Sequence, residues 1–243
     1  MAAIVELKDV SFSAQDQHIV REFSYAFMEG KCTALVGPSG SGKSTVLKLA
    51  AGLLVPTEGE TSFRGRDIFA MSRKENLDFR KEAGVVFQDS ALWANQDLLG
   101  IMELPLRIHF PKMTAAERKK RINEVLEEVG YKRDLGIRPS KLSMGEQKLI
   151  GFARAMMCKP KLLFLDEWTE SLDDSGAQRL IQLVQRHLSE NNTAILVCHD
   201  FRIVRNLADY IVMIVGGKLK STASREQMEE DEDLAQHIEF GIA

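Results

Sequence analysis

One glycine-rich segment limits the fold of this chain more than any other feature of its sequence. Residues 37–45 are Gly37, Pro38, Ser39, Gly40, Ser41, Gly42, Lys43, Ser44 and Thr45. They match the P-loop pattern in full and lie between a strand-like run and a helix-like run, as that motif requires. Glycine lets the backbone approach a phosphate without a Cβ clash, and the positive end of the helix faces the anion. The whole segment is predicted to bind nucleotide phosphates, with Lys43 on the β- and γ-phosphates and Ser44 on Mg²⁺.

Short β-branched runs alternate with helix-like segments in much of the remaining chain. The predicted buried strands are residues 33–36, 84–87, 162–165, 194–197 and 210–215. Predicted helices include residues 44–54 and 175–188. Strands that alternate with helices imply a mostly parallel sheet in an α/β fold.

Residues 97–159 differ from this pattern because they contain no convincing strand. Thr114 and Glu117 have capping-box spacing, which predicts a helix from there to about Val129, ending near Gly130. A second helix is predicted to begin near Ser143. The region therefore reads as a helical subdomain inserted into the α/β core.

Two carboxylates, Asp166 and Glu167, end the apolar run at residues 162–165. If this strand lies beside the P-loop strand, Asp166 can serve Mg²⁺. Glu167 can then act as the base, or as the group that positions the water attacking the γ-phosphate. Many strands end in acids that only cap a helix, so the pair indicates catalysis only together with the P-loop.

Gln88 and His199 each follow a predicted strand. The carboxyl ends of strands are the edge at which open α/β sheets bind ligands, so a γ-phosphate contact is favoured for His199. The Gln88 amide can bond both a metal-bound water and the attacking water, which makes it a candidate for catalysis and for the metal site. By spacing alone, Gln88 is equally compatible with a turn residue.

Composition narrows the function classes. The chain has 243 residues, 44% of them hydrophobic, and a net charge of −3, which gives no electrostatic case for nucleic acid. Its three cysteines are scattered, so free thiols are expected, with Cys32 and Cys198 buried. No apolar run approaches the roughly 20 residues that span a bilayer, and no leader pattern is visible. We therefore expect a cytoplasmic chain whose membrane role comes through a partner.

Residues 142–147 read LSMGEQ, which resembles the LSGGQ signature of ABC ATPases. The order of P-loop, Gln88, this signature, Asp166-Glu167, residues 171–173 and His199 is similar to the whole ABC motif set, over about residues 5–215. The resemblance implies a P-loop NTPase fold, with a RecA-like mixed sheet core, an inserted helical subdomain and an N-terminal antiparallel β portion.

The resemblance also implies domain limits. A single ABC ATPase domain is expected over residues 1–223, with a nucleotide-binding core at 1–96 and 160–223 and the helical subdomain at 97–159. A tail at 224–243 follows. It opens with acidic residues and turns amphipathic at Leu234, Ile238 and Phe240. A solvated helix closing the chain is favoured over an acidic binding tail.

The resemblance further implies ATP and Mg²⁺ as cofactors and two kinds of partner. A second copy of the chain would face the first head to tail, with ATP between the P-loop of one copy and the signature of the other. Ser143 and the backbone N–H of Gly145 would contact the γ-phosphate there. An integral membrane permease would hold the dimer on the inner face of the cytoplasmic membrane.

The permease contact is expected at the groove between the core and the helical subdomain. Its candidate apolar residues are Leu92, Trp93, Leu98, Leu99 and Ile101. They can receive a short permease helix or can simply pack the helical subdomain.

Three departures from the family pattern stand out. Ala14 lies where an aromatic ring usually stacks on adenine; Phe12 can replace that ring, or can be a strand residue of the core. The signature has Met144 and Glu146 where glycine and glutamine are usual. Trp168 replaces the usual proline after the catalytic glutamate. None of these removes a catalytic group.

The type of transporter is indicated by shorter matches. Residues 87–93, FQDSALW, and 103–107, ELPLR, resemble the ATPases of Mla/Mce-type lipid transport systems, as does the ending 234–243. This implies phospholipid or a similar hydrophobic cargo, and a lipid-binding component as a further partner. The alternatives are an importer ATPase for a small polar solute and a soluble non-transport ABC ATPase. A soluble non-transport ABC ATPase would need two cassettes or long coiled-coil arms, which this sequence does not show. A P-loop kinase would not account for the signature at residues 142–147.

Overall fold

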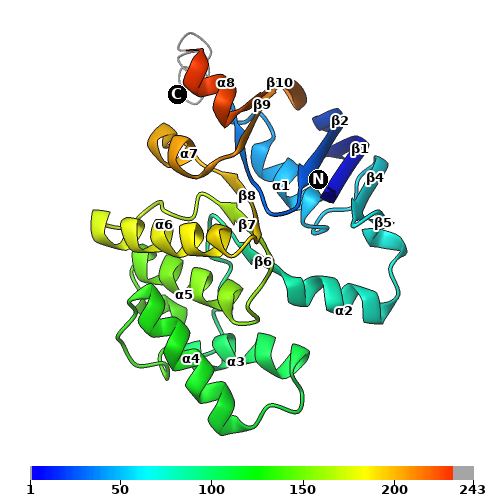
Figure 1. The fold of residues 1–243 in the computed structure, drawn as a ribbon. Helices are drawn as coiled ribbons and strands as arrows, with labels where there is room; N and C mark the ends of the chain where they lie inside the picture. Colours follow the sequence, from blue (N-terminus) through cyan, green and yellow to red (C-terminus); the bar gives the residue numbers. More distant parts are fainter. Residues whose placement is uncertain (1, 232–243) are drawn as a thin grey trace. The chain divides into compact units, whose positions relative to one another are not determined.

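A computed structural model describes residues 2–231 of the chain. They form two compact units, which are taken one at a time (Figure 1). Unit 1 comprises Met1–Asn76 and Leu188–Ala243, and unit 2 comprises Leu77–His187. The predicted amphipathic ending at Leu234, Ile238 and Phe240 lies outside the described residues.

The first sheet of unit 1 is antiparallel. Its strands are β1 (Ala3–Ala14), β2 (Gln17–Met28), β4 (Glu58–Phe63) and β5 (Arg66–Asp67), in the order β2-β1-β4-β5. β1 pairs with both β2 and β4. Val5, Leu7 and Val10 of β1 are buried while most residues next to them are not, as expected for a sheet with one covered face. This sheet is the N-terminal antiparallel portion of the expected fold.

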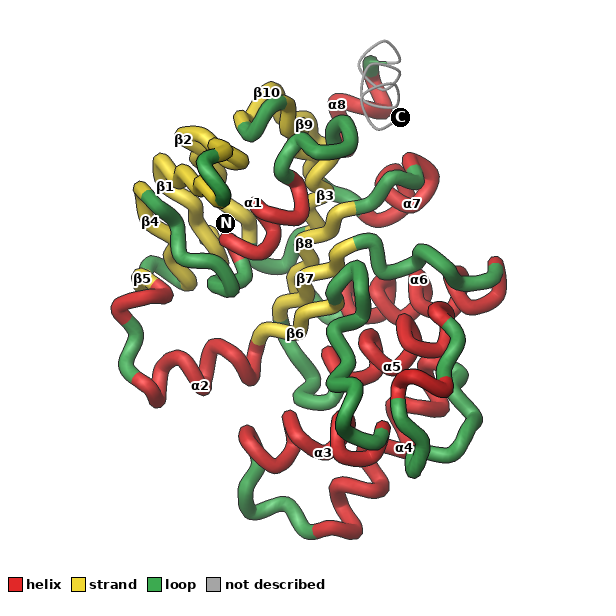
Figure 2. Tube along the Cα trace, turned by 180° about the vertical axis from the view of Figure 1, so that it is seen from behind, coloured by secondary structure: helices red, strands yellow, loops and turns green. Residues whose placement is uncertain are grey.

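The other strands of unit 1 lie in the order β10-β9-β3-β8 (Figure 2). They are β3 (Cys32–Val36), β8 (Thr193–Val197), β9 (Tyr210–Val215) and β10 (Lys218–Ser224). β3 is parallel to β8 and β9, and β10 forms a hairpin with β9. Every residue of β3 and β8 is buried, because parallel strands are covered on both faces.

The helices of unit 1 are short. They include α1 (Lys43–Ala50), η1 (Ile68–Ala70), α7 (Phe201–Leu207) and α8 (Arg225–Glu230). The prediction of a helix at residues 44–54 was too long at its end. Gly52 adopts φ 61° and its N–H donates to Leu49, while the Leu53 N–H donates to Lys48. These two bonds form a Schellman motif, which ends the helix before Gly52. The glycine is visible in the sequence and could have marked this end.

Unit 2 combines a pair of parallel strands with helices. β6 (Ala83–Val86) pairs with β7 (Leu162–Asp166). The helices are α3 (Leu98–His109), α4 (Ala115–Val129), η2 (Pro139–Lys141), α5 (Met144–Met156) and α6 (Asp174–Ser189), which ends in unit 1. α2 (Arg73–Glu82) carries the chain from unit 1 into unit 2. All of residues 97–159 are described, and none of them lies in a strand.

The predicted cap at Thr114, the predicted end near Gly130 and the predicted helix start near Ser143 are confirmed in unit 2, but α2 and α3 were missed. Thr114 and Ser143 cap α4 and α5 with capping boxes, and Gly130 ends α4 in the left-handed conformation. α2 and α3 were not predicted. α3 contains Pro105, which normally ends a helix.

The free cysteines of the described chain include Cys32 and Cys198, both buried as expected. Among the described residues, no helix is long and apolar enough to cross a membrane.

We predict that Thr114→Ala lowers the free energy of unfolding by about 1 kcal/mol, the usual cost of losing an N-cap. The Thr114 hydroxyl accepts a bond from the Glu117 N–H at 3.3 Å, and the Thr114 N–H donates to the Glu117 carboxylate at 2.7 Å. Urea unfolding measures the change. Ser140→Ala, at an exposed position, is the control and should change stability by less than about 0.5 kcal/mol. Equal losses in the two variants would contradict the capping role.

Candidate functional site

The glycine-rich loop of unit 1 passes too close to neighbouring backbone for other residues. Gly37 has φ 140°, and a Cβ there would lie 2.0 Å from the Ile214 carbonyl oxygen. Gly42 has φ 97°, and a Cβ there would lie 2.9 Å from the Ile19 oxygen. The loop is therefore held between β9 and β2 at the carboxyl end of β3, and only glycine fits at these two points.

The loop presents positive groups. Gly42 is the N-cap of α1, and no side-chain hydrogen bond caps this helix end in the described structure. The Lys43 ammonium is buried and donates to the carbonyls of Gly37 at 2.7 Å and Pro38 at 2.9 Å. The Ser41 hydroxyl is buried and has no hydrogen-bond partner among the residues described. Helix N–H groups, an ammonium and an orphaned hydroxyl together suit a phosphate group.

The β1–β2 hairpin lies beside this loop. Phe12 pairs in register with Val20, and a Cβ at Gly42 would lie 3.7 Å from a Val20 methyl group. Val10 is fully buried, whereas Phe12 is only half-buried, because the register of β1 shifts between the two residues. Phe12 is thus not a fully buried core residue. Ala14, at the end of β1, offers no ring for a base.

His199 belongs to the same edge of unit 1 as the loop. β3 and β8 are parallel neighbours, with Leu35 opposite Val197, and the loop and His199 follow their carboxyl ends. His199 is exposed, between the buried Cys198 and Asp200. The Asp200 side chain accepts a bond from the Arg202 N–H at 2.9 Å and so caps α7. The structure therefore brings the P-loop and His199 to one sheet edge.

The two predicted carboxylates end β7 in unit 2. Asp166 and Glu167 are only 1% and 5% exposed. Glu167 has φ 47°, a left-handed conformation that costs a residue with a side chain about 1–3 kcal/mol and persists only where the surroundings fix it. Its carbonyl accepts bonds from the Glu170 N–H at 3.3 Å and from the Lys148 ammonium at 3.0 Å.

Gln88 lies at the neighbouring strand end. β6 ends at Val86, one residue before the end of the predicted strand, and is parallel to β7. The Gln88 amide nitrogen donates to the Glu170 carboxylate at 3.3 Å. The Gln88 carbonyl accepts from the Lys148 ammonium at 2.6 Å. Gln88 and Glu167 are thus joined through one lysine.

Lys148 was not identified from the sequence. It is on α5 and is only 3% exposed. Burial lowers the pKa of its ammonium, opposed chiefly by the negative charges of Glu170 and Asp166. A lysine on a helix normally indicates a solvated position, so no local signal marked this residue.

The signature residues form the start of α5. The Ser143 hydroxyl accepts from the Glu146 N–H at 3.2 Å, and the Glu146 carboxylate accepts from the Ser143 N–H at 2.8 Å. Arg133 donates to both Glu146 oxygens at 2.9 Å, and this bond, with those from Ser143, lowers the pKa of the Glu146 carboxyl. Arg133 therefore offsets the extra negative charge that Glu146 brings to the signature.

The two remaining signature residues, Met144 and Gly145, differ in their surroundings. Met144 is 72% exposed. A Cβ at Gly145 would lie 2.8 Å from the Ser171 carbonyl oxygen and 3.6 Å from a Leu172 methyl group, so Gly145 packs against these two residues. Trp168 is fully buried and acts as a core residue, although its indole N–H has no bond partner in the described part of the chain.

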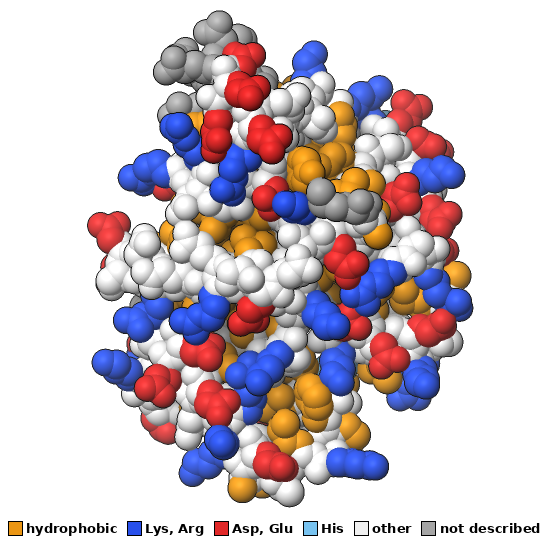
Figure 3. Space-filling view, in the orientation of Figure 1, with side chains coloured by type: hydrophobic (Ala, Val, Ile, Leu, Met, Phe, Trp, Pro, Cys, Tyr) orange, Lys and Arg blue, Asp and Glu red, His pale blue; other side chains and the backbone are white. Residues whose placement is uncertain are grey.

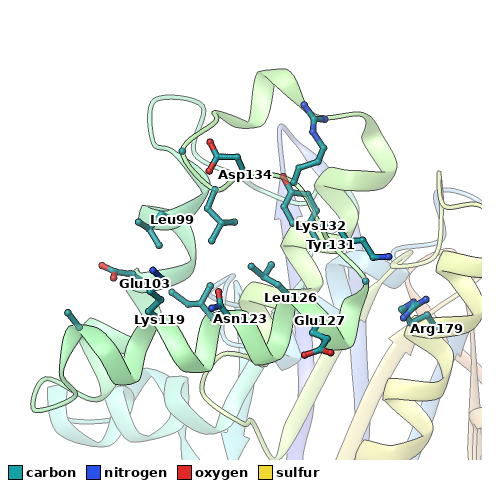
Figure 4. A pocket seen from close by; sticks show the side chains of 16 residues that line it. Leu99, Glu103, Lys119, Asn123, Leu126, Glu127, Tyr131, Lys132, Asp134 and Arg179 are labelled. Atoms are coloured by element: carbon teal, nitrogen blue, oxygen red, sulfur yellow. The ribbon is translucent and has the colours of Figure 1, made fainter.

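Unit 2 also holds a cavity of about 980 Å³ between α3, α4 and residues 130–136 (Figure 4), here termed the α3–α4 cavity. Leu99, Ile122 and Leu126 give it an apolar lining, and charged side chains such as Glu103 and Lys119 also line it. Figure 3 shows hydrophobic side chains flanked by Lys and Arg in the lower part of the view, where Figure 1 places α3 and α4.

The structure divides the predicted apolar contact residues. Leu98 and Ile101 are fully buried, which favours the packing alternative for these two residues. Trp93 and Leu99 are exposed, as are Leu104 and Ile108 of α3.

Comparison with known proteins finds relatives over most of the chain. Residues 20–170 match the family model described as ABC transporter. The chain is 33% identical to the intermembrane phospholipid transport system ATP-binding protein MlaF of Haemophilus influenzae, over 95% of this chain and 88% of that protein. It is 34% identical to the methionine import ATP-binding protein MetN of Corynebacterium diphtheriae, over 78% of this chain but only 56% of that protein.

A solved structure has the same fold. The ATP-binding cassette MJ0796, in a dimeric post-hydrolysis state bound to ADP and Pi, superposes with a TM-score of 0.83. It is 28% identical in sequence, and the match covers 91% of this chain and 98% of that one.

We predict that Ala14→Tyr tightens ATP binding, because a stacked aromatic pair contributes about 0.5–1.5 kcal/mol beyond area burial. The unmodified protein should discriminate weakly between ATP and GTP in competition binding. A preference for ATP of about a hundredfold, or about 2.7 kcal/mol, would contradict this. Phe12→Ala then tests whether the half-buried Phe12 is the stacking ring.

Proposed function

This chain belongs to the ABC transporter family of ATP-binding proteins, and we propose that it is the ATP-hydrolysing motor of a transporter for phospholipid or a similar hydrophobic cargo. Hydrolysis of ATP follows from the family. The observation that carries the cargo is the likeness to MlaF, whose name specifies intermembrane phospholipid transport, over 95% of this chain.

In the proposed site the P-loop binds the phosphates. Backbone N–H groups of the P-loop, in which Pro38 has none, and the start of α1, which no side chain caps, would face the anion. The Lys43 ammonium, held at the loop by two carbonyls, is placed to move onto the β- and γ-phosphates. The buried Ser41 hydroxyl supports the assignment, because a phosphate oxygen would give it a partner.

Ser44, Asp166 and Gln88 are the residues that would hold Mg²⁺. Hydroxyl, carboxylate and amide oxygens, with waters, are the ligands that Mg²⁺ prefers. When bound, the ion neutralises charge on the β- and γ-phosphate oxygens. Asp166 is almost fully buried, so its carboxylate is kept from bulk water.

Glu167 accepts the proton of the attacking water, or orients that water, and Gln88 and His199 complete the site. Glu167 and Gln88 end neighbouring strands, which supports a shared role. His199 follows β8 on the edge that also bears the P-loop, which supports a contact with the γ-phosphate.

The signature acts on ATP bound by a second copy of the chain. Ser143 and the Gly145 N–H would contact the γ-phosphate of that copy in a head-to-tail dimer. The high exposure of Met144 supports this role, because it leaves the start of α5 open to a partner. The relative MJ0796 forms a dimer.

A permease would bind the exposed apolar residues of unit 2 and seat a short helix in the α3–α4 cavity. Trp93, Leu99, Leu104 and Ile108 are exposed large hydrophobic side chains in one stretch of chain. Through this contact the motor would lie on the inner face of the cytoplasmic membrane. Import of a small polar solute is the second candidate, favoured by the likeness to MetN.

We predict that Glu167→Gln binds ATP normally but hydrolyses it about 10²–10⁴-fold more slowly, because glutamine keeps the shape and cannot accept a proton. ATP should then trap a dimer, measured by size-exclusion chromatography. Lys43→Ala is the control and should lose nucleotide binding or hydrolysis. Wild-type hydrolysis by Glu167→Gln would disprove the role of Glu167.

We predict that the protein purified from its native membrane carries a permease and phospholipid, identified by mass spectrometry. Leu99→Asp should release the permease, whereas Leu53→Asp should not; both leucines are 40% exposed, but Leu53 is in unit 1. A permease that co-purifies with an amino-acid- or sugar-binding protein and no lipid-binding component would refute the lipid cargo and leave the motor intact.

A further inference from the structure

The Lys148 side chain links two backbone segments of unit 2, and Lys148 is part of none of the family motifs described above. Its ammonium donates to the Gln88 carbonyl at 2.6 Å and to the Glu167 carbonyl at 3.0 Å. The side chain is 3% exposed and comes from α5, the helix that begins at the signature. One cation thus joins the signature helix to the ends of β6 and β7.

Burying an ammonium is unfavourable unless its hydrogen bonds are made. A lysine has three donors and no acceptor, and here two donors meet backbone carbonyls. Bonds with a charged donor are shorter and stronger than neutral ones, as the 2.6 Å distance to Gln88 illustrates. The bridge therefore fixes the direction of both carbonyls.

Glu167 needs such support. Its φ of 47° is unfavourable for a residue with a side chain, so surrounding bonds must hold the backbone there. The Glu167 carbonyl is one of the two groups that Lys148 binds. The Lys148 bond therefore restrains the peptide unit that joins Glu167 to Trp168, and with it the backbone that carries the Glu167 carboxylate.

The same face of α5 also contacts Ser90 and Ala91, which follow Gln88 in the chain. Lys148, Gly151 and Arg154 are spaced by three residues, which places them on one side of the helix. A Cβ at Gly151 would lie 3.2 Å from the Ser90 Cβ, so the two segments are in close contact. Arg154 donates to the Ser90 carbonyl at 3.1 Å and to the Ala91 carbonyl at 2.6 Å.

We propose that Lys148 is a positioning residue for ATP hydrolysis, which fixes Glu167 and Gln88 relative to each other and to the signature helix through their backbone carbonyls. The proposal rests on the roles proposed above for Glu167 and Gln88. Removal of the bridge slows the hydrolytic step and leaves ATP binding almost unchanged, because the P-loop residues are untouched.

Steady-state ATPase kinetics, ATP binding and thermal unfolding of the full chain test this proposal. Lys148→Met keeps the length of the side chain and removes its donors. It is expected to lower kcat at least about tenfold, since small misplacements of catalytic groups can cost about 10²-fold, with KM changed less than about threefold. Lys148→Gln keeps an amide donor and is expected to restore kcat to within about threefold of wild type.

Lys161→Met is the matched control. Lys161 is exposed and immediately precedes β7, and the bond from its backbone N–H to Glu82 survives the substitution. Its kcat should equal that of wild type. If Lys148→Met does not fold, Lys148→Ser replaces it, because water can enter the space and satisfy both carbonyls without restoring the bridge. The same loss of kcat is expected.

Wild-type kcat in Lys148→Met or in Lys148→Ser overturns the proposal. So does a parallel loss of kcat, ATP affinity and thermal stability that Lys148→Gln does not rescue, because that pattern means a purely structural role. The Glu167→Gln variant distinguishes failure of the Lys148 proposal from failure of the proposed role of Glu167. If it is inactive while Lys148→Met is normal, only the bridge fails; if Glu167→Gln is itself active, the proposed role of Glu167 fails.

Discussion

The passage of the Gly37 backbone against the carbonyl of Ile214 is the constraint on which the phosphate site depends. A Cβ at Gly37 would lie 2.0 Å from that oxygen. The close approach fixes the loop at the end of β3, next to the start of α1, which no side chain caps. The Lys43 ammonium donates to the carbonyls of Gly37 and Pro38 in the same loop. The proposed phosphate site therefore depends first on backbone geometry, and the side chains complete it.

Unit 2 meets a different requirement, which is to orient the buried Glu167 and the exposed Gln88, the two residues proposed to act on the attacking water. Parallel pairing of β6 with β7 puts Gln88 and Glu167 at one edge. Parallel strands alone do not fix the carbonyls beyond their ends, and α5 does so with Lys148. α5 begins at the signature, which is proposed to contact a second copy of the chain. The same helix therefore also holds the strand ends that bear Gln88 and Glu167.

Two of the departures from the family pattern, Glu146 and Trp168, are each compensated by a nearby contact or by burial. Arg133 pairs with Glu146 through two bonds of 2.9 Å, so the signature keeps a balanced charge. Trp168 is fully buried, where a large apolar ring adds packing next to Glu167 in the chain. Ala14 has no such compensation at its own position, and only the half-buried Phe12 offers a ring on the same strand.

The sequence by itself determined what depends on short-range patterns. The P-loop, the capping boxes at Thr114 and Ser143 and the buried strands are of this kind, because a few neighbouring residues specify each of them. Tertiary structure alone decided the rest. It made a helix across Pro105, buried Leu98 where the sequence left packing and a surface contact open, and brought Lys148 to carbonyls 60 and 19 residues away. Contacts at such separations depend on packing, and no local pattern records them.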